Sequence, residues 1–199
     1  MKLLIASNNA HKIREIKEIL GDLFDEILSL REAGVSADPE ETGETFEENA
    51  RIKAEAILQL TGCAALADDS GLEVDALGGA PGVHSARYTG NHDDSDLDRR
   101  KFLMKNLEGE EHRTARFVSA ICCVFPNGDV LRARGTCEGR IATYMKGENG
   151  FGYDAMFIAD GEDRTMAEMT HEEKNEISHR GRALREFARV LKEYCNADK

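Results

Sequence analysis

Apolar and polar residues follow one another along the chain in two periods, one typical of strands and one of helices. Short apolar runs at residues 2–6, 26–30 and 64–67 have the length of buried strands. Between them, residues 13–20 and 46–60 place apolar side chains at the three- and four-residue spacing of a helix that buries one face. Strands therefore alternate with helices in this part of the chain, which is typical of α/β proteins.

Further elements are predicted in the second half of the chain. Residues 93–107 read as a helix, and residues 116–125 and 130–141, which flank a Pro-Asn-Gly-Asp turn, read as a hairpin. A glycine-rich loop at 147–154 precedes a long helix that we expect from about 172 to 194. A hairpin added to alternating strands and helices predicts an α/β fold with a mixed β-sheet.

Polar residues mark where two of the helices begin. Ser7, Asn8 and Asn9 are candidate N-caps for the first helix. Thr45 is followed three residues later by Glu48, which is the pattern of a capping box for the second helix.

Length and composition narrow the class of protein. A chain of 199 residues with 41 % hydrophobic content predicts one globular domain over residues 1–199, with room for two lobes. No apolar run approaches the length of a membrane span, and the first is too short for a secretory signal. The five cysteines form no CxxC pair and are expected as reduced thiols. We expect a cytoplasmic protein with no membrane partner.

The net charge of −12 argues against one class of ligand. Polynucleotides bind through broad basic surfaces, so we expect no polynucleotide partner. A small anionic ligand is still compatible with this charge where a few basic residues converge.

Two adjacent carboxylates, Asp68 and Asp69, follow the apolar run at 64–67, and Ser70 and Gly71 come next. Successive strand residues point to opposite faces, so we expect the two aspartates to have different roles. One would orient backbone or a basic partner while the other faces a cleft. Ligands bind at strand ends in α/β sheets, and Mg²⁺ takes one or two carboxylates together with phosphate oxygens. An Asp-Ser-Gly turn with solvated carboxylates is the alternative.

Two glycine- or asparagine-containing loops are candidate ligand sites. The stretch SNNAHK, residues 7–12, would offer backbone N–H groups at a helix start with Lys12 nearby, which suits phosphate, or it is simply a capped helix with a surface lysine. The stretch GFGYD, residues 150–154, would let an exposed phenyl ring stack on a base, unless Phe151 and Tyr153 both fill the core.

Two further stretches of charged residues are weaker candidates for a ligand site. In EMTHEEKNEISHRG, residues 168–181, Lys174, Ser178 and Gly181 share a helical stripe, and a solvated helix face is the alternative to a binding site. Glu40 and Glu41 precede the second helix and would be either metal ligands or surface charges.

Taken in order, five motifs resemble those of the inosine triphosphate pyrophosphatase family. They are SNNAHK, PEETGETFEENA, ADDSGLEVDALGGAPGVHSARYTG, GFGYDAMF and EMTHEEKNEISHRG. The resemblance extends from residue 2 to about residue 190. Two departures are small: Ser7 stands where threonine is common, and Ala155 stands where proline is common in bacterial members.

The resemblance implies a fold and a reaction. The fold would be α/β, an elongated mixed β-sheet with flanking helices and two lobes around a central substrate cleft, usually as a homodimer. The reaction would be Mg²⁺-dependent hydrolysis of non-canonical purine nucleoside triphosphates (ITP, dITP, XTP and dXTP) to the monophosphate and pyrophosphate, which cleanses the nucleotide pool.

The resemblance also implies roles for individual residues. Glu40 and Asp69 would bind the metal, and Asp69 would be the general base, with Asp68 as a fallback for either role. A phosphate oxygen about 4 Å from a carboxylate costs about 4 kcal/mol at an effective dielectric constant of 20, so carboxylates beside a triphosphate require a cation. The implied substrate-binding residues are Ser7, Asn8, Asn9, Ala10, His11, Lys12, Lys53, Ser70, Phe151, Gly152, Tyr153, Asp154, Lys174, His179 and Arg180.

Three alternatives to this function stay open at the level of sequence. A related enzyme would act on other nucleotides, such as modified pyrimidine triphosphates. A sensor would bind ITP without cleaving it, although Lys12, Glu40 and Asp69 are all present. A structural protein with no ligand would have little use for the polar and glycine-rich loops.

Overall fold

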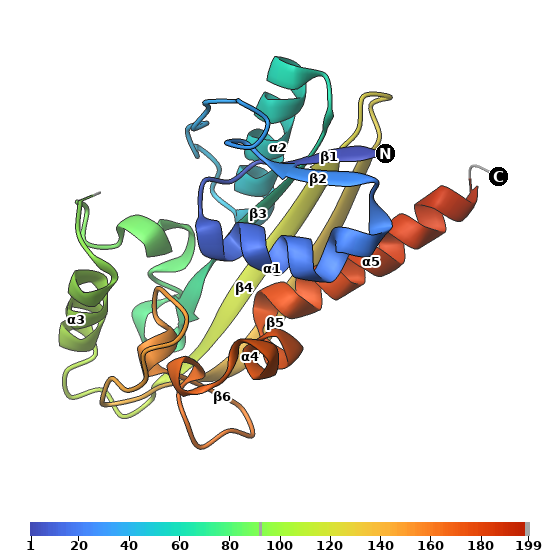
Figure 1. Cartoon of the computed structure of the whole chain (residues 1–199). Helices are drawn as coiled ribbons and strands as arrows, with labels where there is room; N and C mark the ends of the chain where they lie inside the picture. The colour runs from blue at the N-terminus through green and yellow to red at the C-terminus, as the bar shows by residue number, and fades with distance from the viewer. Residues whose placement is uncertain (92, 198–199) are drawn as a thin grey trace. The chain divides into compact units, whose positions relative to one another are not determined.

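The structure is a computed structural model that describes residues 1–91 and 93–197 and places them in two compact units (Figure 1). Unit 1 contains Met1–Asp69, Ser119–Gly135 and the C-terminal segment from Arg180, and unit 2 contains Ser70–Val118 and Thr136–His179. Two units agree with the two lobes that the family resemblance implies, while the cleft expected between the lobes stays a prediction.

Strands and helices alternate as the sequence pattern predicts. The strands are β1 Lys2–Ile5, β2 Glu26–Ser29, β3 Ala64–Val74, β4 Thr114–Val124, β5 Val130–Ile141 and β6 Phe157–Ala159. The helices are α1 Ala10–Leu20, α2 Phe46–Thr61, α3 Asp96–Asn106, α4 His171–Ile177 and α5 His179–Ala197. The strand order is β2-β1-β3-β4-β5-β6. Because β1 runs parallel to β2 and β3 while β5 runs antiparallel to β6, the predicted α/β fold with a mixed sheet is confirmed.

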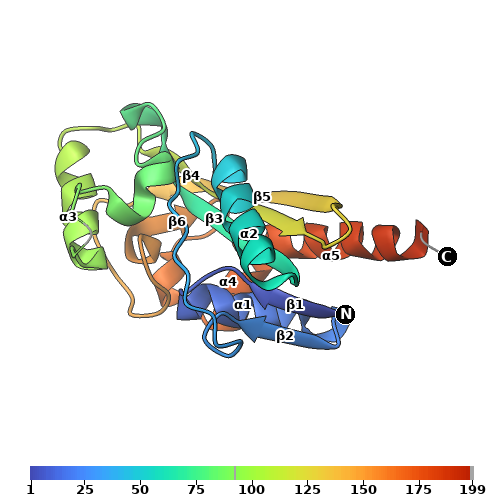
Figure 2. The same ribbon diagram turned by 90° about the horizontal axis from the view of Figure 1, so that it is seen from above.

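In unit 1 the strands bury both faces, and each face is covered by different helices (Figures 1 and 2). Leu3 and Leu66 belong to a cluster with the apolar faces of α1 and α5. Leu4 and Ala65, the neighbouring strand residues, belong to a second cluster with α2. The two-residue period of the strands therefore decides which helix each side chain meets.

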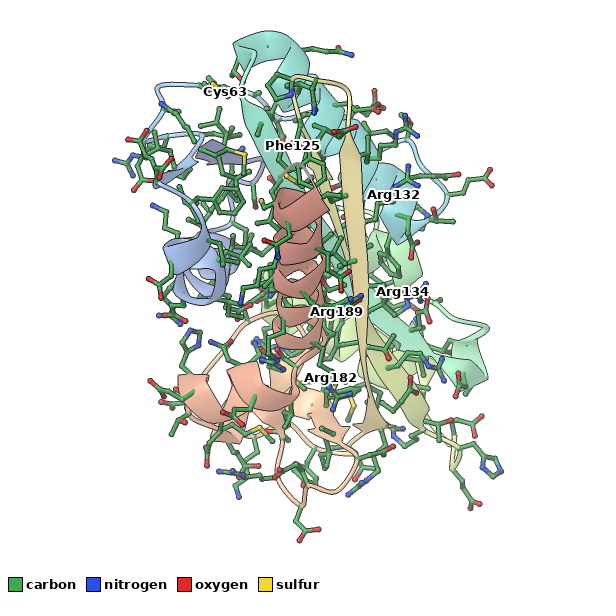
Figure 3. The ribbon with its side chains drawn as sticks, turned by 90° about the vertical axis from the view of Figure 1, so that its right-hand side faces the viewer. Cys63, Phe125, Arg132, Arg134, Arg182 and Arg189 are labelled. Atoms are coloured by element: carbon green, nitrogen blue, oxygen red, sulfur yellow. The ribbon has the colours of Figure 1, made fainter. Side chains whose placement is uncertain are left out.

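Helix α5 lies along the strands of unit 1 and presents arginines to the outside (Figure 3). Arg189 forms ion pairs with Glu186 and Glu193 of the same helix. Phe125, at the end of β4, stacks on Tyr194 with 5.2 Å between the ring centroids. This aromatic contact fixes the C-terminal part of α5 against the strands. None of the helices in the described residues has the length and apolarity required to span a bilayer.

Unit 2 has a hydrophobic core of its own. Leu72 and Phe117 from β3 and β4 pack with Phe157 of β6 and with Met166 and Leu103. The ring centroids of Phe117 and Phe157 lie 4.6 Å apart. This core supports the glycine-rich loop of residues 147–154, because Tyr153 belongs to the same cluster.

Local signals placed the helix starts correctly. Asn9, one of three candidates, is the N-cap of α1, and its side chain accepts hydrogen bonds from the N–H groups of His11 and Lys12. Thr45 and Glu48 form the predicted capping box of α2, with both reciprocal hydrogen bonds present.

The prediction that the third strand ends at Ala67 was wrong. Strand β3 continues to Val74 through Asp68 and Asp69, which are 1 % and 6 % exposed. The strand continues because each carboxylate meets basic side chains on its own face, and a buried charge is tolerated when it is paired. The acidic pair therefore lies in the middle of a strand.

The prediction of one long helix from about 172 to 194 was also wrong. Ser178, with φ −67° and ψ 153°, separates α4 from α5. These dihedral angles are those of a helix N-cap, a position that serine favours. The break ends the helical stripe on which Lys174, Ser178 and Gly181 were expected to lie together.

Candidate active site

Asp68 points to the face of β3 that α1 and α5 cover, and three groups bind its carboxylate. Lys12 Nζ lies 2.8 Å from Oδ2, Arg180 Nε lies 3.2 Å from the same oxygen, and Ser119 Oγ donates to Oδ1 at 2.5 Å. Burial alone would raise the pKa of Asp68, but the charges of Arg180 and Lys12 lower it well below its usual value. Asp68 is thus a charged carboxylate that binds both Lys12 and Arg180.

The network around Asp68 extends into α1. Arg180 Nη1 lies 2.5 Å from Oε2 of Glu15, and both side chains are almost fully buried. The pKa of Arg180 is raised, because the charges of Asp68 and Glu15 outweigh the opposing effect of burial. Glu15 and Ser119 were missed at the level of sequence. The sequence features that could have indicated them are the spacing of Glu15, three residues after Lys12, and the position of Ser119 as a serine within an apolar strand.

Asp69 points to the opposite face of β3, toward α2. Its Oδ1 accepts a hydrogen bond from Lys53 Nζ at 2.7 Å, and the same ammonium donates to Glu41 Oε1 at 2.7 Å. Its Oδ2 is buried and has no hydrogen-bond partner among the residues that the structure describes. Burial raises the pKa of Asp69, although Lys53 and Lys12 oppose the rise. One oxygen of this carboxylate is therefore available to a ligand or a proton.

The expectation that the two aspartates point to opposite faces is confirmed by their contacts, while their different roles stay a prediction. Asp68 binds α1 and α5 residues, while Asp69 binds Lys53 of α2. Lys12 Nζ and Lys53 Nζ both also donate to the main-chain carbonyl of Asp68, at 3.3 and 3.0 Å. The two ammonium groups therefore meet at this peptide from opposite faces of the strand.

The first loop offers phosphate a smaller set of donors than its sequence suggests. Asn9 Oδ1 accepts hydrogen bonds from the N–H groups of His11 and Lys12. Ser7 Oγ accepts one from the N–H group of Asn9 at 3.1 Å. The side-chain amide of Asn8 donates to the carbonyl oxygen of Ala37 at 3.2 Å. Within the described part of the chain, only the N–H groups of Asn8 and Ala10 are left without a partner in this loop. The donors for an anion here are these two amides and Lys12.

The predicted metal ligands are compatible with Mg²⁺ but do not form a preformed cage. No group of three or more histidine, cysteine, aspartate or glutamate side chains in residues 1–91 and 93–197 could hold a metal ion. Glu40 is exposed and makes no hydrogen bond or ion pair with any described residue, whereas its neighbour Glu41 is tied to Asp69 through Lys53. Mg²⁺ needs only one or two carboxylates when phosphate oxygens complete its shell, so the unbound oxygen Asp69 Oδ2 and the exposed carboxylate of Glu40 are donors of a kind that suits it.

In unit 2, Asp154 and Lys174 organise the loop of residues 150–154. Asp154 Oδ2 accepts hydrogen bonds from Phe151 N–H at 2.9 Å and from Lys174 Nζ at 2.6 Å. Lys174 Nζ also lies 4.8 Å from the centroid of the Phe151 ring. Gly150 has φ +76°, and a Cβ there would lie 2.1 Å from Asp154 Oδ2, so no larger residue fits.

The two aromatic residues of this loop have different environments. Tyr153 is 4 % exposed and donates its hydroxyl hydrogen to Ser85 O at 2.8 Å. Tyr153 therefore fills the core, as the alternative interpretation of this loop expected. Phe151 is half-buried and lies beside a cavity of about 140 Å³ lined by Gly150, Gly152 and Asp154 among others. Only Phe151 is therefore placed to offer a ring face to a ligand.

The remaining predicted residues are distributed between the units. His179 belongs to unit 2, where it stacks on Phe117 at 4.7 Å, and Arg180 belongs to unit 1. Ser70, half-buried, is the first residue of unit 2. The roles of these three residues toward a substrate stay predictions.

Comparison with known proteins gives a consistent result. A sequence profile of the Ham1 family matches residues 3–190. A dITP/XTP pyrophosphatase from Exiguobacterium sp. strain AT1b is 50 % identical over 94 % of this chain and 95 % of its own. A HAM1 protein from Coxiella burnetii superposes with a TM-score of 0.88 at 41 % identity, covering 97 % of this chain and 99 % of its own. A nucleoside-triphosphatase (dITP/XTP pyrophosphatase) from Mycobacterium abscessus superposes with a TM-score of 0.76 at 45 % identity, covering 92 % and 97 %.

Proposed function

The chain belongs to the Ham1 family, and from that premise we propose that it hydrolyses dITP, ITP and XTP to the monophosphate and pyrophosphate with Mg²⁺. The observation that carries this proposal is the buried carboxylate oxygen Asp69 Oδ2, which lacks a partner among the described residues while Lys53 fixes the other oxygen. A carboxylate held in this way can accept a proton without first giving up a hydrogen bond.

Basic groups in unit 1 support binding of the triphosphate. Lys12 and Lys53 place two positive charges at the Asp68 peptide in a protein whose net charge is −12. The N–H groups of Asn8 and Ala10, at the positive end of the α1 dipole, would add two donors. Local positive charge of this kind attracts an anion despite the overall negative charge.

The chemical step would be attack of water on the α-phosphorus. Asp69 takes a proton from the attacking water, the bond between the α-phosphorus and its bridging oxygen breaks, and pyrophosphate leaves with the electron pair. Lys12 and Lys53 stabilise the negative charge that develops on the phosphates. Glu40 and Asp69 would hold Mg²⁺, and a bound Mg²⁺ would supply neutralisation of phosphate charge and a lower pKa for water.

The loop of residues 150–154 in unit 2 would bind the base. Phe151 would stack on the purine, as its half-exposed ring allows. Hydrogen-bond donors from His179 and Arg180 would satisfy the C6 oxygen of hypoxanthine or xanthine and oppose the amino group of adenine. Family resemblance supports these two assignments, as it does our expectation of a cytoplasmic homodimer that cleanses the nucleotide pool.

Product analysis tests this function directly. The purified protein would be given ITP, dITP, XTP, dGTP and ATP in turn with Mg²⁺, and the products would be separated. We expect pyrophosphate and the monophosphate from ITP, dITP and XTP, little from ATP, and loss of the reaction after chelation by EDTA. Release of orthophosphate would place the cleavage at another bond, and equal rates on all five nucleotides would contradict the base selection.

A further inference from the structure

Asp96 is not among the residues assigned above, yet its carboxylate contacts the loop that carries Phe151. It is the first residue of α3, whose N-cap is Ser95. Asp96 Oδ2 accepts a hydrogen bond from Gly152 N–H at 2.6 Å, and Oδ1 accepts one from Arg99 Nη2 at 2.6 Å. The contact joins two segments of unit 2 that lie 56 residues apart in the sequence.

With this hydrogen bond, both peptide groups that flank Phe151 are bound by a carboxylate. The N–H of Phe151 belongs to the peptide before its Cα and is bound by Asp154, while the N–H of Gly152 belongs to the peptide after it and is bound by Asp96. Peptide groups are planar, so holding both of them fixes the two backbone torsions of Phe151. The direction in which the Phe151 side chain leaves the backbone therefore depends on two carboxylates from different elements.

The state of Asp96 suits this task. Burial would raise its pKa, but hydrogen bonds from Arg99 and from Gly152 N–H lower the pKa below its ordinary value. The group is then a charged acceptor at neutral pH, and a charged acceptor binds an N–H more strongly than a neutral one. Asp96 also lines the 140 Å³ cavity beside Phe151, together with Arg100.

We propose that Asp96 is a positioning residue for base recognition: it fixes the Gly152 peptide so that the Phe151 ring is held ready to stack on the purine. This inference rests on the proposed function, because it assumes that the loop binds the base. It predicts that loss of Asp96 weakens ligands that carry a base and leaves ligands without a base unaffected.

The test compares three variants. Asp96→Ala removes the acceptor. Asp96→Asn keeps the shape but has only one oxygen for two donors, Gly152 N–H and Arg99. Asp98→Ala is the matched control, because Asp98 lies in the same helical turn, caps the same helix by accepting from Ser95, and is exposed. Both alanine variants should lower the thermal unfolding midpoint by a similar amount.

The readouts separate positioning from general damage to the helix. For Asp96→Ala we expect the KM for ITP to rise about tenfold, as loss of one charge-assisted hydrogen bond implies, with kcat within about threefold of the wild type. The inhibition constant of inosine monophosphate should rise by the same factor, and that of pyrophosphate should not change. Asp96→Asn should give a smaller rise, and Asp98→Ala should give none.

Two results would overturn the role of Asp96: wild-type affinity for inosine monophosphate in both Asp96 variants, or equal loss in Asp98→Ala. Failure of the proposed function looks different, since the wild-type protein would then release no pyrophosphate from any of these nucleotides. Affinities for inosine monophosphate measured by calorimetry require no turnover, and they decide the role of Asp96 in that case.

Discussion

Asp68 and Asp69 are adjacent in β3 but point to opposite faces of the strand, where their side chains have different partners and their pKa values shift in opposite directions. On the α1 and α5 face, Asp68 is bound by Lys12, Arg180 and Ser119, and folding lowers its pKa. On the α2 face, Asp69 has one oxygen bound by Lys53 and one buried oxygen without a described partner, and folding raises its pKa. The folded protein therefore favours the charged form of Asp68 and disfavours that of Asp69.

The difference shows how one residue type can have all its acceptors bound at one position and keep a buried, unbound oxygen at the next. A carboxylate surrounded by donors gains from its charge and stabilises the fold. A carboxylate that is buried with too few donors is held at a cost, which is typical of groups that do chemistry. The strand period alone assigns the two aspartates to their different surroundings.

The largest effect on stability should come from breaking the network behind Asp68. Glu15→Gln removes one partner of the buried Arg180, and such losses typically cost about 3–5 kcal/mol. The control is Glu18→Gln on the same helix, whose carboxylate is exposed and lies 3.8 Å from Arg14, and which should change the free energy of unfolding by less than about 0.5 kcal/mol. Urea denaturation measures both. Equal unfolding curves for the two variants would show that the network contributes nothing.

A smaller effect, on substrate binding, is expected at Lys12, which is more exposed than Arg180, the other cation bound to Asp68. Lys12→Met keeps the apolar stem and removes the charge, so the KM for ITP should rise about ten- to a hundredfold, as loss of a charged hydrogen bond of about 1.5–3 kcal/mol implies. Lys17→Met, which removes the partner of Glu32 further along α1, should leave KM unchanged. Steady-state kinetics with ITP measure both KM values. An unaltered KM in Lys12→Met would show that Lys12 does not bind the triphosphate.

The smallest effect should distinguish the two adjacent glutamates, Glu40 and Glu41. Glu40 has no described partner, whereas Lys53 already neutralises Glu41. Glu40→Gln should therefore raise the Mg²⁺ concentration for half-maximal rate by about tenfold, since one carboxylate ligand is lost. Glu41→Gln should raise it by less than about threefold. A Mg²⁺ titration at saturating ITP measures both values, and the reverse order would make Glu41 the ligand.

Sequence alone predicted the features that depend on near neighbours. The capping box of Thr45 and Glu48, the hairpin, and the opposite faces of Asp68 and Asp69 follow from spacings of a few residues. The motif resemblance added residues such as Lys53 and Lys174, which the structure places in ion pairs with Asp69 and Asp154, while their roles toward a substrate stay predictions.

Features that depend on distant partners were not predictable from these spacings. Strand β3 passes through two charges only because Lys12, Lys53 and Arg180, from three helices, bind them. Nothing near Asp96 in the sequence points to Gly152. Glu15 looks like a surface residue of an amphipathic helix until its partner Arg180 is known.

The most direct test of the account compares Asp69→Asn with Asp68→Asn for both stability and turnover at saturating ITP. We predict that Asp69→Asn keeps its free energy of unfolding within about 1 kcal/mol, because burial opposes the charge that the substitution removes, and loses pyrophosphate release by about 10²–10⁴-fold. Asp68→Asn should lose about 3–5 kcal/mol of stability while its folded fraction keeps a much larger share of the rate. Near-normal turnover by a folded Asp69→Asn protein would contradict the account.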